Sequence, residues 1–336
     1  MTGTDNRNTD GNTPLLAIRD LVVSFATDEG QRIRAIDGVC LDVKPGEILG
    51  IVGESGCGKS VTALSVMRLL PKPAGRIESG RIIFDNIDLA KLAPNRMRAY
   101  RGSRISMIFQ EPMTALNPVH TVGRQLVEAV LLHKKNIGKK EAMSIAVEML
   151  EMVGIPEPGR RMGEYPHQLS GGMRQRIMIA MALSCGPDLL IADEPTTALD
   201  VTVQAQILEL IKRMQAGTGM SVIMITHDLG VIAETSSRVC VMYAGRIVET
   251  ADVKTLFSSP AHPYTRGLLA SIPRLGTRRK TRLPVIPGVV PSLSDLPPGC
   301  RFQNRCDRVM DICRSVPPEP TVVGTGHTAA CHAIGM

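Results

Sequence analysis

Residues 53–60 read Gly53-Glu54-Ser55-Gly56-Cys57-Gly58-Lys59-Ser60 and match the phosphate-loop pattern G-x-x-x-x-G-K-[ST] at every fixed position. Residues 47–52 have the mostly apolar character of a short buried strand, and residues 61–70 have the pattern of a helix that Pro71 ends. The glycines let the backbone N–H groups turn inward, and the N-terminus of the helix adds a positive end. The sequence therefore predicts a strand, a phosphate-binding loop and a helix in succession.

Two residues of this loop are predicted to contact ligands through their side chains. We expect Lys59 to reach the β- and γ-phosphates of a nucleotide, and the hydroxyl of Ser60 to hold Mg²⁺. Cys57 stands at a variable position, so its side chain is expected to point away and to have no chemistry of its own. All of residues 53–60 then line the predicted nucleotide site.

The composition limits the class of protein. A chain of 336 residues, 43% of them hydrophobic, has room for one large or two modest domains with a core. The net charge of +7 is a mild excess that by itself indicates little. Only 3% of the residues are aromatic and none is Trp, so the stacking platforms of a single-strand nucleic-acid binder are missing.

The N-terminus and the apolar runs bear on location. Residues 1–13 are polar and include acidic residues, so we expect a disordered lead-in without the apolar stretch of a signal peptide. No later run reaches the roughly 18 apolar residues that a helix needs to cross a membrane. We therefore expect a cytosolic protein, whose membrane role depends on partners.

Short apolar pieces surround the phosphate loop. A small antiparallel sheet is predicted from the pieces at residues 15–18, 21–25, 35–36 and 39–43. Two further strands are predicted at residues 80–85 and 105–109. Phe25, one of few aromatic residues in this half, either stacks on an adenine ring or belongs to the core, and the sequence alone leaves both interpretations open.

Gln110 directly follows the second of these strands and precedes a loop that contains Glu111 and Pro112. A Gln in this place can touch a metal or a water and move with the loop, although a lone Gln is more often only solvated. Residues 122–155 then carry apolar residues at helical spacing. They predict a helical subdomain inserted into the α/β core.

A second helix start suited to an anion follows, with the sequence Leu169-Ser170-Gly171-Gly172-Met173-Arg174-Gln175-Arg176. Ser170 is a candidate N-cap, and Gly171 and Gly172 leave the backbone N–H groups bare. Taken alone, this pattern predicts no more than a well-capped helix.

Two carboxylates and a histidine stand at the ends of further apolar strands. Residues 189–194 end in Asp193 and Glu194, and residues 221–226 are followed by His227. After a phosphate loop, Asp193 is expected to complete the Mg²⁺ shell beside Ser60. Glu194 is expected to accept a proton from the attacking water, and His227 to sense or position the γ-phosphate.

In this order, the motifs resemble those of the nucleotide-binding subunits of ABC transporters over residues 14–257. The correspondences are residues 53–60 to the Walker A motif, Gln110 to the Q-loop, residues 169–175 to the signature, residues 189–194 to Walker B, residues 198–200 to the D-loop and His227 to the H-loop. The signature has Met173 where the family has Gln, a change that leaves Ser170, Gly171 and Gly172 in place. The resemblance implies an α/β P-loop NTPase fold of ABC type, with an antiparallel β subdomain and a helical subdomain at about residues 111–183.

The resemblance also implies how such subunits act. ATP is bound between two subunits arranged head to tail, by the Walker motifs of one and by Ser170, Gly171 and Gly172 of the other. Closure on ATP and opening after hydrolysis then drive membrane subunits, and the Gln110 loop couples the two. The implied catalytic residues are Glu194, His227 and Lys59, and the implied Mg²⁺ ligands are Ser60, Gln110 and Asp193.

The remaining residues narrow the resemblance. Residues 259–269 and 283–291 look like the C-terminal region of oligopeptide, dipeptide and nickel importer subunits, most of all the D-type ATPase of dipeptide and oligopeptide importers. This implies a C-terminal extension at residues 258–336 and an ATPase at the cytoplasmic face of the inner membrane that powers peptide transport, with nickel or glutathione-type import as alternatives. The implied partners are a second ABC ATPase, two membrane permeases and a periplasmic or extracellular substrate-binding protein.

Four of the eight cysteines fall in this extension, namely Cys300, Cys306, Cys313 and Cys331. Clustering in a Pro-rich segment that builds little core suggests a staple, and a reducing compartment argues against disulfides. The spacing is not that of a zinc ribbon, although His327 and His332 could join a zinc site. The related dipeptide importer subunits imply a four-thiolate [4Fe-4S] cluster, with zinc and unliganded thiols as open alternatives.

Two other classes of function are weighed against an ATPase. A soluble ABC protein that acts on nucleic acid or ribosomes predicts tandem cassettes or a long coiled coil between Lys59 and Ser170, but about 110 residues separate them and each motif occurs once. A regulatory module with a dead nucleotide site is opposed by the presence of Lys59, Asp193, Glu194 and His227. We therefore expect a transporter ATPase without a nucleic-acid partner.

Overall fold

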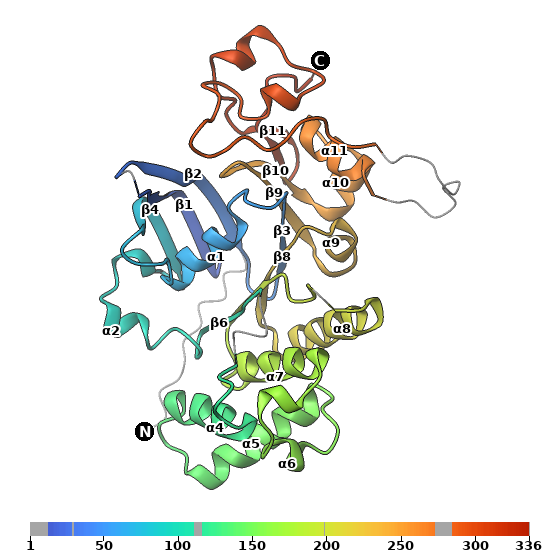
Figure 1. Ribbon diagram of the computed structural model, residues 1–336. Helices are drawn as coiled ribbons and strands as arrows, with labels where there is room; N and C mark the ends of the chain where they lie inside the picture. Colours follow the sequence, from blue (N-terminus) through green and yellow to red (C-terminus); the bar gives the residue numbers. More distant parts are fainter. Residues whose placement is uncertain (1–12, 29, 111–115, 198, 273–283, 336) are drawn as a thin grey trace.

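The computed structural model describes residues 13–28, 30–110, 116–197, 199–272 and 284–335. Within these ranges the chain forms a sheet of strand order β2-β1-β4-β5, a larger sheet of order β11-β12-β10-β9-β3-β8-β7-β6, and a separate layer of helices (Figure 1). The predicted lead-in, apart from Thr13, and the loop of Glu111 and Pro112 lie outside the described residues.

The smaller sheet is antiparallel, as predicted. Its strands are β1 (Leu16–Ala26), β2 (Arg32–Val43), β4 (Gly75–Phe84) and β5 (Ile87–Asp88). Two of the predicted pieces form one strand, because the register shifts near Asp20, whose φ of +48° makes a bulge instead of a turn. The connection back to the larger sheet holds η1 (Leu89–Lys91) and α2 (Pro94–Met97).

The centre of the larger sheet is parallel and buried. It consists of β6 (Ile105–Ile108), β7 (Leu189–Asp193), β8 (Ser221–Thr226), β3 (Ile48–Val52) and β9 (Arg238–Tyr243). These strands read as continuous apolar runs because both faces of the sheet are covered. The carboxyl ends of parallel strands meet at one edge, and the phosphate loop, Glu194 and His227 follow three of them there.

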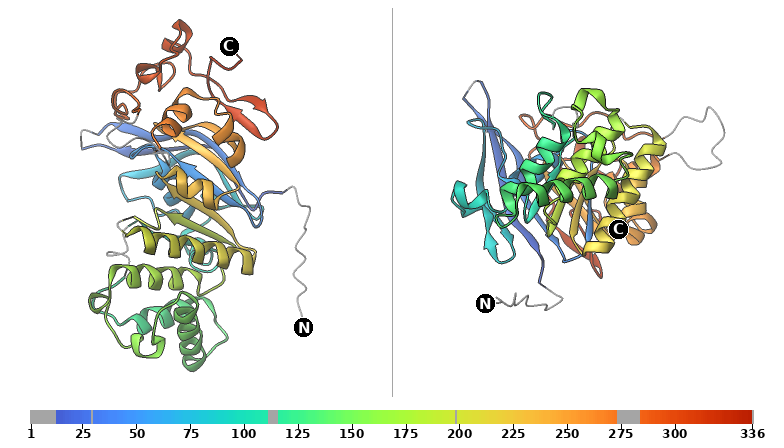
Figure 2. Two further views of the ribbon diagram at one scale, coloured as in Figure 1. Left: turned by 90° about the vertical axis from the view of Figure 1, so that its right-hand side faces the viewer. Right: turned by 90° about the horizontal axis from the view of Figure 1, so that it is seen from below.

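Helices cover the larger sheet and form the separate layer. Around the sheet lie α1 (Lys59–Met67), α8 (Val201–Thr218), α9 (Leu229–Thr235), α10 (Val253–Ser258) and α11 (Pro263–Ala270). The separate layer holds α4 (Val122–His133), α5 (Lys139–Met152), α6 (Pro158–Arg161), η2 (Pro166–Gln168) and α7 (Gly171–Leu183). Figure 2 shows this layer at one end of the molecule, with the C-terminal residues at the other. An inserted helical subdomain is therefore present.

The C-terminal residues extend the larger sheet instead of forming an isolated tail. β10 (Arg246–Asp252) pairs antiparallel with β12 (His327–Ala329), which pairs with β11 (Thr321–Gly324). The turns η3 (Gln303–Arg305) and η4 (Asp311–Arg314) precede β11 and β12; Cys306 directly follows η3 and Cys313 lies in η4. Tyr264 and Phe302 pack into the same buried cluster as the strands. The α/β fold with an antiparallel sheet and an extension is confirmed, while the predicted domain limits stay predictions.

Candidate nucleotide-binding site

The phosphate loop connects β3 to α1 through glycines with positive φ. The φ angles are +155° at Gly53, +76° at Gly56 and +107° at Gly58. A side-chain carbon at Gly53 would lie 2.2 Å from the carbonyl oxygen of Met242, and one at Gly58 would lie 2.7 Å from Cδ1 of Ile36. Both positions therefore require glycine, because the backbone conformation and the space exclude any other residue.

Lys59 folds back over this loop. Its Nζ donates to the carbonyl oxygens of Gly53 at 2.7 Å and Glu54 at 3.1 Å, and the residue is only 6% exposed. Its charge also interacts with Asp193 and Glu194. The side chain of Cys57 is buried in the core under the antiparallel sheet. The loop thus holds the positive charge of Lys59 close to the carboxylates of Asp193 and Glu194.

Ser60 and Asp193 lie together, and their donor atoms fit a cation. Asp193 is 3% exposed, it hydrogen-bonds with Ser60, and its Oδ1 has no hydrogen-bond partner. Burial raises the pKa of Asp193, which the Ser60 hydrogen bond opposes and the charge of Glu194 reinforces. A buried carboxylate oxygen without a partner is costly unless a cation completes it, and carboxylate plus hydroxyl is a set of ligands that Mg²⁺ accepts.

Glu194 is at the centre of a group of polar side chains. Its Oε2 accepts from Gln110 Nε2 at 3.2 Å and from Thr197 Oγ1 at 2.8 Å, and its Oε1 lies 3.2 Å from His227 Nδ1. Its φ of +48° turns the backbone directly after the strand. Burial alone would raise the pKa of Glu194, but the hydrogen bonds from Thr197 and His227 outweigh it and lower that pKa. The carboxylate therefore stays ionised and able to accept a proton.

The predicted signature residues lie at a different place, at the start of α7. The Ser170 hydroxyl accepts from the backbone N–H of Met173 at 3.3 Å and caps the helix, as expected. Ser170 and Gly171 are exposed, and Gly172 is half-buried. α7 belongs to the helical layer, whereas α1 packs beside the antiparallel sheet (Figure 1). The two predicted anion-binding helix starts therefore stand in different layers of the molecule.

Phe25 lies near the end of β1. It pairs with Ile33 of β2, is half-buried, and packs against the core of the antiparallel sheet. A side-chain carbon at Gly75 would lie 2.8 Å from its ring, so the ring covers that glycine. These contacts fit a core Phe, and its predicted contact with an adenine ring stays a prediction.

The four C-terminal cysteines lie near one another. Each of the thiols of Cys300, Cys306 and Cys331 interacts electrostatically with the other three cysteines of the group. Burial raises the pKa of all three thiols, to about 11 for Cys300. Among the described residues, no group of three or more His, Cys, Asp or Glu side chains could hold a metal ion. The four cysteines are therefore not arranged as ligands of a single metal ion, and the predicted metal site is not supported in that form.

Three residues that contact the predicted site were missed from the sequence. Thr197 donates a hydrogen bond to Glu194. The Tyr264 hydroxyl accepts a hydrogen bond from the backbone N–H of Glu54, and Arg305 forms an ion pair with the Glu54 carboxylate. Thr197 follows Walker B within three residues, and that closeness was a usable signal. Tyr264 and Arg305 are more than 200 positions away from Glu54, with separations of 210 and 251, and no local pattern marks them.

Comparisons with known protein families assign two parts of the chain. Residues 36–197 match the model of the family described as ABC transporter, and residues 248–313 match the one described as oligopeptide/dipeptide transporter, C-terminal region. The first range ends just after Walker B, and the second contains Tyr264, Arg305 and three of the clustered cysteines.

Curated relatives match nearly the whole chain. A probable peptide ABC transporter ATP-binding protein of Sinorhizobium fredii is 56% identical, and the dipeptide transport ATP-binding protein of Bacillus subtilis is 55% identical, each over 94% of this chain and 94% of the relative. An oligopeptide transport ATP-binding protein of Mycobacterium tuberculosis is 51% identical over 95% of this chain and 52% of its own.

Solved structures match the cassette. A dimeric ATP-binding cassette bound to ADP and phosphate has a TM-score of 0.64 and 28% identity, and covers 71% of this chain and 98% of its own. A subunit of an ABC transporter complex from Clostridium perfringens has a TM-score of 0.61 and 26% identity, and covers 73% and 91%. The chain therefore belongs to the ABC transporter family, as an ATPase subunit of the type that carries the oligopeptide/dipeptide C-terminal region.

Proposed function

We propose that this ATPase powers the transport of dipeptides or oligopeptides across the cytoplasmic membrane. The main support is that one chain combines two features. It has the residues expected for ATP hydrolysis, and its C-terminal part matches the oligopeptide/dipeptide transporter region; the residues are Lys59, Asp193, Glu194 and His227. The names of the relatives from Sinorhizobium fredii and Bacillus subtilis support a peptide substrate. Nickel and glutathione-type peptides are the alternatives that the experiment below separates.

The roles of the site residues follow from their contacts. The inward N–H groups of the phosphate loop and Lys59 bind the phosphates, while Ser60 and Asp193 hold Mg²⁺, which neutralises charge on the phosphate oxygens when bound. A water held by Glu194 attacks the γ-phosphorus, the bond to the bridging oxygen of ADP breaks, and Glu194 accepts the proton of the water. Gln110 and His227 orient the Glu194 carboxylate through their hydrogen bonds.

The second ATPase subunit is proposed to complete the site. Ser170 caps α7, Ser170 and Gly171 are exposed, and α7 lies apart from the phosphate loop of its own chain, so this helix start suits a nucleotide bound by a partner. The family arranges two cassettes head to tail, and in this arrangement each nucleotide meets one phosphate loop and one signature.

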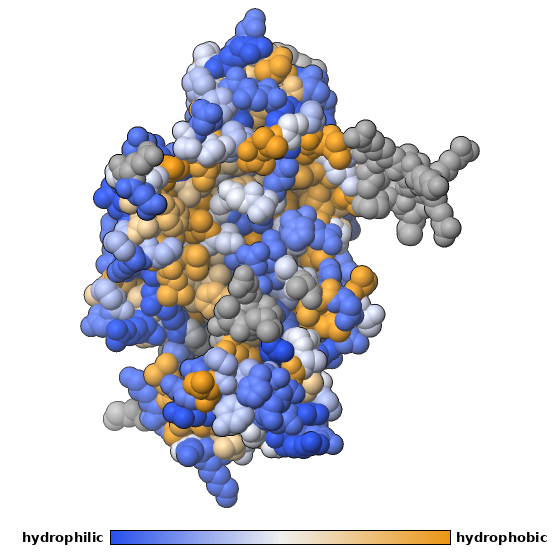
Figure 3. All heavy atoms as spheres, in the orientation of Figure 1, coloured by the Kyte–Doolittle hydropathy of each residue, from blue (hydrophilic) through white to orange (hydrophobic). Residues whose placement is uncertain are grey.

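The permease subunits need a surface on the helical layer, and an apolar groove supplies one. Leu131, Leu132 and Met143 are 36%, 69% and 40% exposed, and with Val127 and Met162 they line a cavity of about 700 Å³. Apolar side chains are visible on this layer at the bottom of Figure 3. No helix in the described ranges is long and apolar enough to span a bilayer. We propose that permeases held in this groove keep the ATPase at the cytoplasmic face of the inner membrane, with a substrate-binding protein on the other side.

We also propose that the four clustered cysteines bind an iron–sulfur cluster. The backbone N–H of Arg308 donates to Cys306 Sγ, and that of Ala333 donates to Cys331 Sγ, both at 3.4 Å. Such N–H groups favour thiolates, and a cluster of several irons accepts thiolates that stand further apart than the ligands of one ion. Iron and sulfide analysis of the purified protein tests this, and absence of iron with a featureless visible spectrum would reject it.

The experiment for the transport function uses Glu194→Gln, which traps the ATP-bound state. We expect hydrolysis to fall by about 10²–10⁴-fold with ATP affinity kept, because only the proton acceptor is lost. Glu209→Gln on α8 is the matched control, since its side chain is 66% exposed. Loss of ATP binding in Glu194→Gln would contradict the assigned role.

The same variant, tagged and recovered with ATP from membranes, tests the partners. Two permeases and a second ATPase should co-purify, and the substrate-binding protein belonging to them identifies dipeptide, oligopeptide, glutathione-type peptide or nickel. Recovery of ribosomes or nucleic acid without permeases would instead favour the soluble ABC class.

A further inference from the structure

Two residues of the C-terminal extension hold the phosphate loop at Glu54. The backbone N–H of Glu54 donates to the Tyr264 hydroxyl at 2.9 Å. Its carboxylate accepts hydrogen bonds from both terminal nitrogens of Arg305, at 2.6 and 2.9 Å. A bidentate pair of this kind fixes orientation as well as distance.

Arg305 and Tyr264 are themselves rigidly packed. The Arg305 side chain is 4% exposed, its Nε donates to the Pro287 carbonyl at 3.0 Å, and its guanidinium lies 5.8 Å from the Tyr243 ring. The Tyr264 ring lies 4.7 Å from that of Tyr243 and 5.4 Å from that of Phe302. Buried ion pairs contribute little net stability once desolvation is counted, so this geometry points to positioning.

The position of Glu54 matters because Lys59 lies on the same stretch of backbone. Its Nζ is held by the carbonyl oxygens of Gly53 and Glu54. Moving the Glu54 peptide therefore moves the acceptors of Lys59 and the adjoining N–H groups of the loop that is proposed to bind the phosphates.

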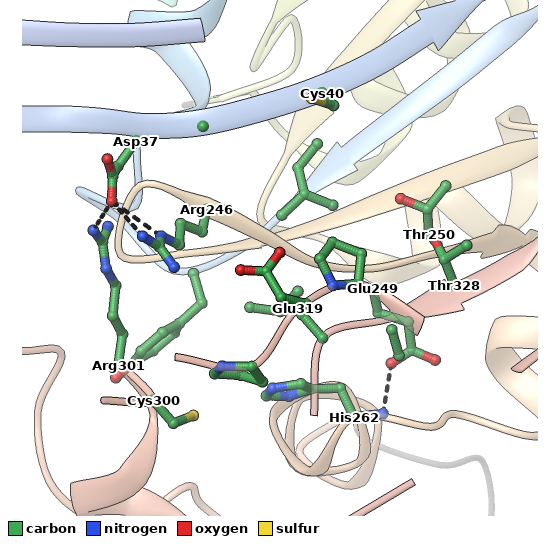
Figure 4. Close-up of a pocket in the computed structure, with 18 of the residues that line it drawn as sticks. Asp37, Cys40, Arg246, Glu249, Thr250, His262, Cys300, Arg301, Glu319 and Thr328 are labelled. Carbon is green, nitrogen blue, oxygen red and sulfur yellow. Dashed lines mark hydrogen bonds and ion pairs between the residues drawn. The ribbon is translucent and has the colours of Figure 1, made fainter. Parts of the chain in front are cut away.

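The segment that carries Arg305 begins and ends with clustered cysteines, Cys300 and Cys306. Between them, Arg301 pairs with Asp37 of β2, and Phe302 enters the aromatic cluster. The segment also borders a cavity of about 530 Å³ that Arg246 and Glu319 line as well (Figure 4). Figure 4 shows Arg301 and Arg246 reaching Asp37 from one side of this space. The segment is thus anchored on the cassette and has free volume beside it.

We propose that Arg305 and Tyr264 are positioning residues that hold the phosphate loop in shape for ATP, so that residues 300–306 act as a brace on it. The brace rests on the nucleotide site proposed above. It makes ATP affinity depend on the conformation of a segment bounded by the cysteine cluster.

The test compares Arg305→Met with Arg301→Met in the full-length protein. Both remove a buried guanidinium from the same segment and keep the apolar stem, but only Arg305 contacts the phosphate loop. We expect Arg305→Met to raise the Kd for trinitrophenyl-ATP with Mg²⁺ by about 2- to 30-fold, the range for residues that act through coupling. Arg301→Met should stay near the wild-type Kd, and equal increases in both variants would reduce the brace to support of the fold.

Three more measurements keep the proposal falsifiable if Arg305→Met folds poorly. Tyr264→Phe removes one hydroxyl and keeps the ring packing, so it should raise the same Kd by a smaller factor. The double variant Glu54→Gln/Arg305→Met should bind ATP no more weakly than Arg305→Met, because both changes break the same link. The kcat at saturating ATP should change little in Arg305→Met and in Tyr264→Phe, since neither residue contacts the groups around Glu194.

An unchanged Kd in both Arg305→Met and Tyr264→Phe would overturn the brace. Lys59→Ala separates this failure from failure of the nucleotide site. If Lys59→Ala loses affinity while Arg305→Met does not, only the brace is rejected, whereas full affinity in Lys59→Ala rejects the site itself.

Discussion

α1 follows a glycine-rich loop and α7 begins with two glycines, yet their first turns are completed differently. Gly58 precedes α1 with a φ of +107° and no side-chain cap. Ser170 precedes α7 and caps it through its hydroxyl. Uncapped N–H groups at a helix start need a partner, and an anion is the natural one. The start of α1 therefore depends on a ligand, whereas one N–H group of α7 is already satisfied by its own cap and the start of the helix can face another molecule.

The start of α11 is a third case, and its cap is buried inside the protein. His262 caps it through Nδ1, which accepts from the backbone N–H of Tyr264 at 3.0 Å, and the residue is 1% exposed. The cap thus orders the residue that reaches Glu54 in the phosphate loop. The start of α1 depends on a ligand, that of α7 on a hydroxyl and that of α11 on a neutral imidazole. Each of these partners can be removed by a separate substitution.

Among the three helix starts, the largest effect is expected from Lys59→Ala, which removes the positive charge beside the uncapped start of α1. Hydrogen bonds to charged groups are worth about 1.5–3 kcal/mol, so ATP affinity should fall by about 10- to 100-fold. Titration with trinitrophenyl-ATP measures this. Lys91→Ala is the control, since that side chain is 79% exposed at the end of η1, and a similar loss there would remove the contrast.

How far the sequence predicts this site depends on how local its chemistry is. The phosphate loop, the carboxylates at the end of β7 and His227 were placed correctly at strand ends, because each motif contains the residues that shape its own backbone. α1 begins at Lys59, two residues before the predicted start, because the loop itself supplies the first turn.

Long-range contacts were not predictable in the same way. Arg305 is one of many arginines in a Pro-rich segment, and only the folded chain brings it to Glu54. β11 was also missed, because its four residues are exposed and carry no alternating apolar pattern. Its pairing comes from β12, which continues the edge of the sheet at β10.

The next effect concerns the buried cap of α11 and depends on pH. Burial lowers the pKa of His262 from 6.5 to about 4, so between these values the unfolded chain binds a proton that the folded chain does not. Stability is therefore lost as pH falls, by about 2 kcal/mol between pH 7 and pH 5 from this group. Urea unfolding at pH 5, 6 and 7 measures the loss.

His262→Asn tests the source of this pH dependence. Asn keeps a side-chain oxygen that can accept at an N-cap, but it does not titrate. The variant should therefore lose less stability between pH 7 and pH 5 than the wild type, whatever its absolute stability. Parallel pH profiles for the two proteins would assign the loss to other groups.

The smallest effect is expected from Ser170→Ala at the start of α7. Loss of an N-cap costs about 1 kcal/mol of stability, and loss of one hydrogen bond to a partner's nucleotide slows hydrolysis by about 2- to 10-fold. Thr121→Ala removes the equivalent cap of α4, where Thr121 accepts from the N–H of Arg124 at 3.3 Å. Unfolding and ATP hydrolysis of both purified variants are compared at protein concentrations that favour pairing.

Both variants should lose similar stability, but only Ser170→Ala should hydrolyse ATP more slowly, with the ATP affinity of the single chain unchanged. That combination would show that the start of α7 acts on a nucleotide bound by a second molecule. A loss of ATP affinity in the single chain would instead show that Ser170, like Lys59, binds the nucleotide of its own chain. Equal hydrolysis in Ser170→Ala and Thr121→Ala would leave α7 as a capped helix and nothing more.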